Sequence, residues 1–218
     1  MQIPARYNGP PGSGNGGWSA GTFAEAAGAS VDGRAYVVTL RVPPPLATEL
    51  TLTGGKVLDP AGTLVAEVAA DADAGAGVPV ADPAEAGPYP GLSAHPFPGC
   101  YVCGPEHPTG LRIFPGPLPD GRMAATWDVP AEVTVPLMWA ALDCPGGWSA
   151  LQSGRTFVLG RIAVAVDALP APGDRCVVVG TAVSAEGRKA VVDSTVYGQD
   201  GTRHARARAT WIALDPVS

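Results

Sequence analysis

The sequence predicts an α+β fold built from two similar halves, each a helix followed by antiparallel strands. The pentapeptide Gly-Gly-Trp-Ser-Ala occurs at 16–20 and again at 146–150. Short strand-like runs, separated by hairpin signals, follow both copies. A segment rich in proline and glycine, residues 71–99, lies between them and lacks apolar periodicity. We therefore expect a first half at 1–70, a linker at 71–99 and a second half at 100–218.

In the first half, the residues predict one helix and four short strands. Apolar side chains recur at helical spacing from Ala20 to Ala27, so we expect a helix from Gly17 to Gly28. Alternating runs rich in β-branched residues then predict the strands. These strands span 35–42, 49–53, 56–59 and 63–69.

The second half is expected to begin with two strands, at 111–114 and 123–127. A short helix at 136–142 follows. We expect Pro145 and the adjacent glycines to break it, with a second helical piece at 148–153. Four longer strands complete the chain. They span 157–167, 175–184, 190–198 and 203–214.

The two halves also match in the order of their features. Residues 40–54 and 166–180 both read as a strand, a proline turn and a second strand that ends at glycine. Gly62-Thr63 and Gly201-Thr202 both precede an alternating strand. The copies are offset by 130, 126 and 139 residues (146 − 16, 166 − 40 and 201 − 62), as expected for a duplicated domain with small insertions. We therefore expect the two glycine pairs to open two equivalent helices.

The charge pattern argues against a nucleic-acid partner. The net charge is −6, and arginines alternate with other residues in the densest basic stretch, 203–208. Alternation places these arginines on one face of a strand, where a solvated surface is their ordinary role. The N-terminal residues lack the pattern of a signal peptide, and no apolar run is long enough to span a membrane. We therefore expect a cytoplasmic protein with four reduced cysteines and no membrane partner.

One helix wrapped by an antiparallel sheet, with a glycine pair at the helix start, resembles the hotdog fold. The repeat resembles a single-chain double hotdog. Asn15-Gly16-Gly17 is similar to the His-Gly-Gly helix start of phenylacetate-type hotdog thioesterases. Residues 40–54 and 166–180 resemble the family's two strands joined by a Pro…Gly-Asp turn. Residues 100–111, which begin Cys-Tyr-Val-Cys-Gly and end Gly-Leu, resemble a Cys-x-x-Cys-Gly…Asn-Pro-x-Gly-Leu motif of some members.

The resemblance covers most of 12–70 and 100–214 and implies an activity and a ligand. Two hotdog units of this family pair into one continuous sheet with two sites at their interface. The implied ligand is acyl-CoA or another acyl thioester, handled without a metal or a cofactor. A homodimer of double hotdogs is one assembly that the resemblance allows.

The resemblance also assigns roles to the two pentapeptides. The family binds the thioester carbonyl at the N-terminus of the central helix, where free N–H groups and the helix dipole stabilise negative charge. This role falls to Gly16-Gly17 and to Gly146-Gly147. The alternative is that each glycine pair only relieves a steric clash at a helix start. Trp18 and Trp148 are expected to pack in the core, with walling of the acyl group as the alternative.

The family supplies a carboxylate, as base or nucleophile, from the central helix about two turns past the partner's glycine pair. Glu25, eight residues past Gly17, is the first candidate, and we expect it to face Gly146-Gly147. Family members usually carry the acid one residue nearer, and an exposed surface charge is the other interpretation of Glu25. Asp143 is the second candidate for the same site, either as the carboxylate itself or as a residue that orients water. Its alternative role is a helix cap.

The second site is expected to differ from the first. At the offset of 130, Arg155 is the counterpart of Glu25 (25 + 130), so this site lacks the carboxylate. Arg155 would lie with Gly16-Gly17 in a binding site, where it could hold a CoA phosphate. Asn15 replaces the family's histidine and could donate a hydrogen bond through its amide.

The cysteines raise the question of a metal. Cys100-x-x-Cys103 lies between His95 and His107, and tetrahedral zinc accepts such ligands. Zinc sites usually separate two ligand pairs by a longer loop, so we predict a structural turn and no metal; a redox dithiol is the other alternative. Cys144 at an expected helix start would be a stabilised thiolate, but no histidine close in sequence supports a nucleophile.

The leading functional prediction is therefore an acyl-CoA thioesterase-like hydrolase that works without a metal. A hydratase or dehydratase would need a paired histidine and carboxylate, which the sequence does not show. A non-catalytic acyl-CoA or lipid-binding hotdog module is the other alternative. The missing histidine and the difference between Glu25 and Arg155 favour it.

Overall fold

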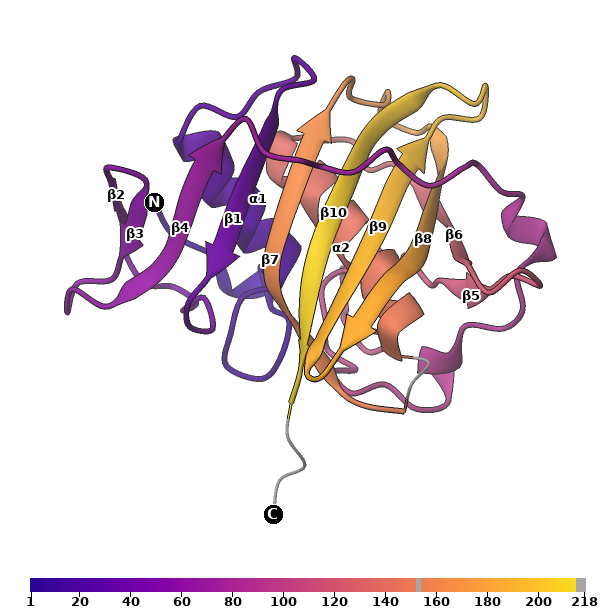
Figure 1. Ribbon diagram of the computed structural model, residues 1–218, viewed down its shortest axis with the longest axis horizontal. Helices are drawn as coiled ribbons and strands as arrows, with labels where there is room; N and C mark the ends of the chain where they lie inside the picture. Colours follow the sequence, from indigo (N-terminus) through magenta and orange to yellow (C-terminus); the bar gives the residue numbers. More distant parts are fainter. Residues whose placement is uncertain (152–153, 215–218) are drawn as a thin grey trace.

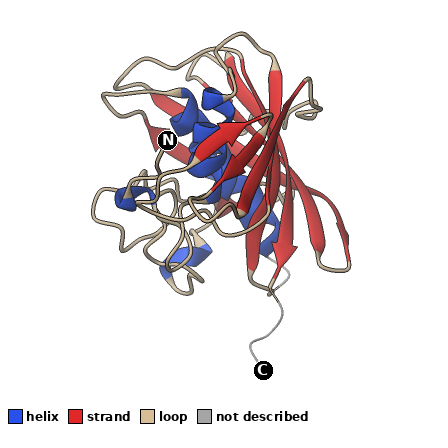
Figure 2. Cartoon of the chain, turned by 90° about the vertical axis from the view of Figure 1, so that its left-hand side faces the viewer, coloured by secondary structure: helices blue, strands red, loops and turns tan. Residues whose placement is uncertain are grey.

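The computed structural model describes residues 1–151 and 154–214. In these residues a ten-stranded antiparallel sheet carries two α-helices on one face (Figure 1, Figure 2). The strand order is β2-β3-β4-β1-β7-β10-β9-β8-β6-β5, and the expected α+β class is confirmed. The elements are η1 (Ala5–Tyr7), α1 (Gly16–Ala26), β1 (Ala35–Leu40), β2 (Thr51–Thr53), β3 (Lys56–Leu58), β4 (Leu64–Ala70), η2 (Pro83–Glu85), η3 (Pro90–Leu92), β5 (Gly116–Pro117), β6 (Met123–Asp128), α2 (Val135–Leu151), β7 (Phe157–Val166), β8 (Arg175–Glu186), β9 (Lys189–Tyr197) and β10 (Arg203–Ala213), where η marks a 3-10 helix.

Helix α1 begins at a side-chain cap. The Asn15 Oδ1 atom accepts a hydrogen bond from the N–H of Trp18 (2.8 Å), which satisfies one free donor of the first turn. Beyond the other end, Gly28 adopts a φ of 100°, a left-handed conformation that stops helices. A Cβ at Gly17 would lie 2.6 Å from the Cβ of Asp143, so glycine is required where α1 meets α2. The predicted helix is confirmed with slightly different bounds.

Helix α2 is one continuous helix, and the predicted break at Pro145 is wrong. Pro145 lies inside α2, and residues 135–150 are all buried. Packing rather than intrinsic propensity stabilises such a helix, so a proline and two glycines do not end it. The second predicted piece, 148–153, is the end of α2 as far as Leu151, and residues 152–153 lie outside the described part. No helix within 1–151 or 154–214 is both long and apolar enough to cross a bilayer.

The strand order repeats from the middle of the sheet outward. Strands β1 and β7 pair at the centre, with Val37 opposite Ala163. From there, one side runs β1, β4, β3, β2 and the other runs β7, β10, β9, β8. The segments α1–β4 and α2–β10 therefore share one connectivity, and the second half adds β6 and β5 beyond β8.

The caps of the two helices, rather than the two pentapeptides, occupy equivalent positions. Thr134 Oγ1 accepts a hydrogen bond from the N–H of Leu137 (3.3 Å), just as Asn15 does from Trp18 three residues on. The caps are offset by 119 residues (134 − 15), whereas the pentapeptides are offset by 130. The second glycine pair therefore lies late in α2, and the prediction that both pairs open helices is wrong.

The segment predicted as a strand at 111–114 is not part of the sheet. The N–H of Leu111 donates to Tyr101 O (2.8 Å) and that of Ile113 donates to Val102 O (3.0 Å). Arg112 between them has a φ of 54°, which a regular strand does not allow. The apolar run thus pairs with the turn that carries Cys100 and Cys103. The strand in this region is β5 instead.

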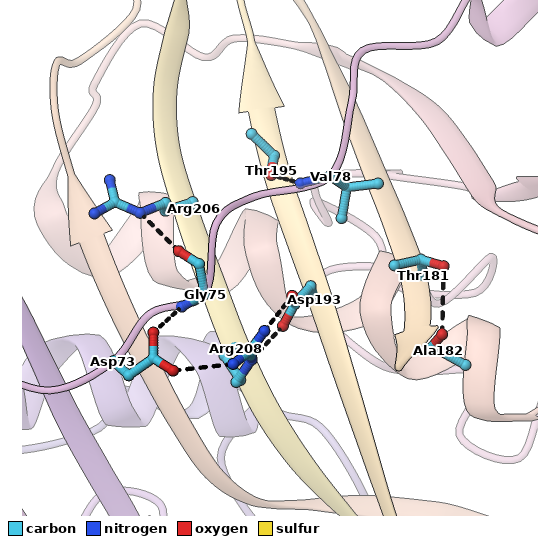
Figure 3. A network of polar contacts seen from close by, with 9 residues as sticks. All are labelled: Asp73, Gly75, Val78, Thr181, Ala182, Asp193, Thr195, Arg206 and Arg208. Atoms are coloured by element: carbon cyan, nitrogen blue, oxygen red, sulfur yellow. Dashed lines mark hydrogen bonds and ion pairs between the residues drawn. The ribbon is translucent and has the colours of Figure 1, made fainter. Parts of the chain in front are cut away.

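The linker crosses the outer face of the sheet, opposite the helices (Figure 1). Asp73 binds Arg208 of β10 (2.9 Å), and the Gly75 carbonyl accepts from Arg206 (3.0 Å). The N–H of Val78 then donates to Thr195 Oγ1 of β9 (2.7 Å; Figure 3). We call residues 71–79 the strap.

Beyond the strap, the chain passes around the β6–β5 edge to the helix side of the sheet. Arg122 Nη1 donates to the carbonyl of Pro79 (2.6 Å) at this edge. The N–H of Gly87 donates to Pro117 O of β5 (2.8 Å). Residues 95–103 then lie against α2, and several of them line a pocket at the N-terminus of α1.

Candidate functional site

The N-terminus of α1 meets the middle of α2 at a buried carboxylate. The Oδ2 atom of Asp143 accepts a hydrogen bond from the N–H of Gly17 (2.9 Å) and another from Asn15 Nδ2 (3.2 Å). Asp143 and Asn15 are each 2% exposed. A carboxylate at this position also faces the positive end of the α1 dipole.

The electrostatics of Asp143 reflect a partly satisfied buried acid. Among the described residues, its second oxygen, Oδ1, has no hydrogen-bond partner. Burial raises the pKa of Asp143 to about 7, while the N–H of Gly17 and the Asn15 amide lower it. A buried acid at a helix start, with one oxygen that has no hydrogen-bond partner among the described residues, is an arrangement that suits acid–base or nucleophilic chemistry.

A pocket opens beside Asp143 between the start of α1, the second half of α2, strand β7 and the linker. Asp143 and Asn15 are polar groups in a wall that is otherwise largely apolar and aromatic. The lining residues are Gly9, Pro10, Asn15, Gly16, His95, Pro96, Phe97, Cys100, Cys103, Asp143, Cys144, Trp148, Leu151, Phe157, Val158, Leu159 and Trp211.

Three of these lining residues bring their thiols together. The Sγ atoms of Cys100, Cys103 and Cys144 all lie within 4.8 Å of one another, and all three residues are buried. Hydrogen bonds from the Cys103 and Cys144 thiols lower the pKa of Cys100 well below its ordinary value. Asn15 Nδ2 lies 3.7 Å from Cys100 Sγ, and His95 Nε2 lies 3.3 Å from Cys103 Sγ. We call these three cysteines the thiol cluster.

The sequence suggested His95, Cys100, Cys103 and His107 as possible metal ligands, and the structure brings only three of these four together. His95 reaches the thiol cluster, but His107 does not, because its Nε2 atom contacts the carbonyl of Arg6 (2.8 Å). Cys144 joins from α2, 41 residues beyond Cys103 (144 − 103). Sequence spacing around Cys100 and Cys103 could not reveal this third thiol.

The predicted pairing of Glu25 with Gly146-Gly147 is wrong. Glu25 is exposed and lines a second pocket at the start of α2, together with Thr134 and Pro136. Gly146 lies ten residues beyond Pro136, which is about 15 Å along the axis of α2.

The glycine pair of α2 serves packing rather than an oxyanion. Its N–H groups belong to the interior of a helix, where they pair with carbonyls of the preceding turn. A Cβ at Gly147 would lie 2.3 Å from the ring of Trp211 in β10, and one at Gly146 would lie 2.8 Å from Val192 in β9. These glycines let α2 lie close to the sheet, and the predicted oxyanion role for them is wrong.

Arg155 is not at the site predicted for it. Its Nη1 atom donates to the carbonyl of Gly187 in the β8–β9 turn (2.7 Å), and its side chain is exposed. Arg155 does not line the pocket at the start of α1. Gly17 therefore contacts Asp143 rather than Arg155, so the site predicted to lack a carboxylate contains one.

The two tryptophans of the pentapeptides face different pockets. Trp148 lines the pocket with Asp143 and lies edge-on to Tyr89 (4.9 Å between ring centroids) and His95 (5.3 Å). Trp18 stacks on Tyr7 (3.5 Å) and lines the second pocket. Of the two, only Trp148 is placed to contact a ligand beside Asp143.

The cap of α2 is the signal that would have identified the correct partner of Asp143. If Thr134 is aligned with Asn15, Pro136 is the counterpart of Gly17 (17 + 119). Asp143 then lies seven residues past that counterpart, the spacing that the resemblance in the sequence implies for an acid. The sequence-based prediction instead aligned the two pentapeptides, at an offset of 130 residues.

Comparison with known proteins addresses the fold. No protein-family model matches the sequence, and no curated protein matches it. A candidate thioesterase from Novosphingobium aromaticivorans DSM 12444 is 16% identical and has a TM-score of 0.67, with 99% of this chain and 94% of that chain covered. A protein of unknown function with a hot dog fold from Alicyclobacillus acidocaldarius is 15% identical and has a TM-score of 0.58, with coverages of 99% and 92%. At such identities the likeness concerns the fold alone, and by it this chain has the hot dog fold.

Proposed function

We propose that this chain hydrolyses an acyl thioester, such as an acyl-CoA, at the pocket between α1 and α2. The observation that carries the proposal is the buried carboxylate of Asp143, held by the N–H of Gly17 and the amide of Asn15 at a helix N-terminus. We further propose that the two segments with matching connectivity are two hotdog units in one chain, a double hotdog.

The start of α1 supplies donors for a developing oxyanion. Gly16 is the first residue of α1 and lines the pocket, and a first-turn N–H has no partner within its own helix. The thioester carbonyl oxygen becomes negative when it is attacked, and the Gly16 N–H group can stabilise that charge, while the Gly17 N–H stays with Asp143. One such donor contributes about 10²- to 10³-fold to turnover.

Asp143 is the group that drives the attack. It takes a proton from water, or attacks the carbonyl carbon itself to give an anhydride that water then opens. In either route the C–S bond breaks, the thiol leaves with a proton and the acid product forms. Asn15 keeps the carboxylate pointed at the start of α1.

The apolar wall of the pocket fits the acyl part of a thioester. Phe97, Trp148, Leu159 and Trp211 supply large apolar or aromatic surfaces beside Asp143. Binding sites for small molecules combine such a lining with few polar groups, which fix the orientation of the ligand.

The second pocket lacks the elements of this chemistry. By the offset of 119, Ala24 stands where Asp143 stands in the first pocket (143 − 119), and Pro136 stands where Gly17 stands. Proline has no N–H to donate. Glu25 lies in this pocket, but none of the described residues that line it is a glycine at a helix start. We therefore assign a single active site to the chain.

Release of free CoA from a panel of short, long and aryl acyl-CoAs tests the proposal. Asp143→Asn keeps the shape of the side chain and should lower kcat by about 10²-fold or more. Glu25→Gln, in the second pocket, is the matched control and should keep the wild-type rate. If the wild-type protein binds acyl-CoA but turns over no member of the panel, the chain is a binding module instead.

A further inference from the structure

The thiol cluster has the dimensions of a tetrahedral metal site. Its three Sγ atoms lie within 4.8 Å of one another. Four-coordinate zinc binds thiolates at about 2.3 Å, which sets the sulfurs about 3.8 Å apart. Closing the cluster around an ion therefore needs side-chain shifts of about 1 Å or less. We propose that Cys100, Cys103 and Cys144 bind a zinc ion, with His95 as the fourth ligand.

The turn at Cys100–Cys103 is built to hold a thiolate. The amide of Asn15 donates to Cys100 Sγ (3.7 Å), and the N–H of Gly104 donates to Cys100 O and closes the turn (2.8 Å). Hydrogen bonds of this kind orient and stabilise metal-bound ligands. The turn closes so tightly that a Cβ at Gly104 would lie 2.4 Å from the backbone nitrogen of Cys100, so only glycine fits there.

His95 is within reach of the fourth position. Its Nε2 atom lies 3.3 Å from Cys103 Sγ, and a tetrahedral zinc site sets such nitrogen and sulfur ligands about 3.5 Å apart. The Nδ1 atom accepts the N–H of Phe97 (2.8 Å), so without a metal the ring proton is on Nε2. Binding through Nε2 moves that proton to Nδ1, and the N–H of Phe97 must then turn away.

The number and kind of donors favour a metal over a dithiol switch. A disulfide needs two sulfurs, whereas this cluster holds three, with an imidazole beside them. Cys100 and Cys103 are 5% and 4% exposed, which keeps oxidants away from the thiols. Soft thiolates with one imidazole select zinc over hard cations. Zinc binding releases to solvent the protons that the three thiols carry.

The ion would link residues 95–103, at the end of the linker and just beyond it, to helix α2. Cys100 and Cys103 belong to the segment that covers the pocket, and Cys144 belongs to the middle of α2. A metal bridge would hold that cover in place beside Asp143 whether or not the chain hydrolyses thioesters.

Metal content and a cobalt spectrum test the inference. Protein expressed with added zinc and purified under reducing conditions should hold one zinc per chain. Exchange for Co²⁺ should give strong thiolate-to-cobalt charge-transfer absorption and the visible bands of tetrahedral cobalt. Cys144→Ser should lower zinc affinity at least tenfold, whereas Cys176→Ser, a buried thiol in β8 outside the cluster, should retain it. His95→Gln should weaken binding in the same way, and His107→Gln should not.

Three results would overturn the inference. The first is a reduced, folded wild-type protein that takes up neither zinc nor cobalt. The second is wild-type affinity in folded Cys144→Ser, and the third is a Cys100–Cys103 disulfide in freshly isolated protein by mass spectrometry. If Cys144→Ser fails to fold, the wild-type cobalt spectrum decides, because its charge-transfer intensity reports the number of thiolate ligands. None of these readouts depends on turnover.

Discussion

Asn15 uses both ends of its side-chain amide. Its oxygen caps α1 through the N–H of Trp18, and its nitrogen donates to Asp143 and lies near Cys100. Asn15 therefore connects the helix start, the proposed catalytic acid and the thiol cluster.

Asn15→Ser separates these two functions of the side chain. Serine is as good a helix cap as asparagine, so the capping contribution to the free energy of unfolding should be kept within about 0.5 kcal/mol, and any larger loss of stability should come from the missing hydrogen bond to Asp143. Serine cannot reach Asp143, so the loss of a hydrogen bond to a charged group should lower kcat about 10- to 100-fold. Urea unfolding and CoA release measure the two effects. Wild-type stability and wild-type kcat in this variant would mean that Asn15 acts only as a cap.

Sequence reasoning at the residue scale named Asp143 but gave it the wrong partner. Asn15, Gly16 and Gly17 were all candidates, and their contact with Asp143 follows from helix packing rather than from any local pattern. Cys144 could be judged only by its neighbours in sequence, none of which is a histidine. The partner of Asp143 becomes visible in the sequence only when the caps of the two helices, Asn15 and Thr134, are aligned with each other.

At the scale of elements, periodicity predicted the strands well and the second helix poorly. The segments that form β1, β4, β7 and β10 show a clear strand-like pattern of apolar residues and are bounded by clear turn signals. Helix α2 is buried on all sides, so it carries no amphipathic period, and Pro145 in it is a misleading stop signal. The run at 111–114 has strand composition but pairs with a turn, which composition cannot show.

Gly147→Ala measures how tightly α2 lies against the sheet. In an exposed helix this change would stabilise by about 1 kcal/mol, because alanine favours the helix. Here the added methyl would lie 2.3 Å from Trp211, and overpacking should destabilise the protein by about 1–3 kcal/mol. Thermal and urea unfolding give the sign directly. A rise in Tm would show that α2 has room to move away from β10.

At the scale of the whole molecule, the linker is part of the fold rather than a tether between halves. The strap lies on the outer face of the sheet, and the chain then passes around the β6–β5 edge to the helix side of the sheet (Figure 1, Figure 2). Its Pro- and Gly-rich composition predicted a linker, and residues 71–99 contain neither a strand nor an α-helix but only the short 3-10 helices η2 and η3. Its course depends on single polar contacts with strands that come more than 100 residues later, which composition does not specify.

Arg208 is the residue through which the sheet holds the strap. It binds Asp73 of the strap (2.9 Å) and makes a two-bond contact with Asp193 of β9 (2.8 and 2.9 Å; Figure 3). Asp73 is exposed, whereas the side chain of Asp193 is only 9% exposed. The two carboxylates should therefore respond very differently when Arg208 is removed.

Asp73→Asn removes only the exposed ion pair between Asp73 and Arg208, so it should lower the free energy of unfolding by less than about 1 kcal/mol. Arg208→Leu leaves the Asp193 carboxylate buried without its partner, which should cost about 3 kcal/mol or more. Both variants should let a protease cut faster within the strap, since each releases the contact of Asp73. Urea unfolding and limited proteolysis with mass-spectrometric mapping give the two readouts. If Asp73→Asn left the cleavage rate within 71–79 unchanged, the ion pair would not hold the strap, and the contacts of Gly75 and Val78 would have to suffice.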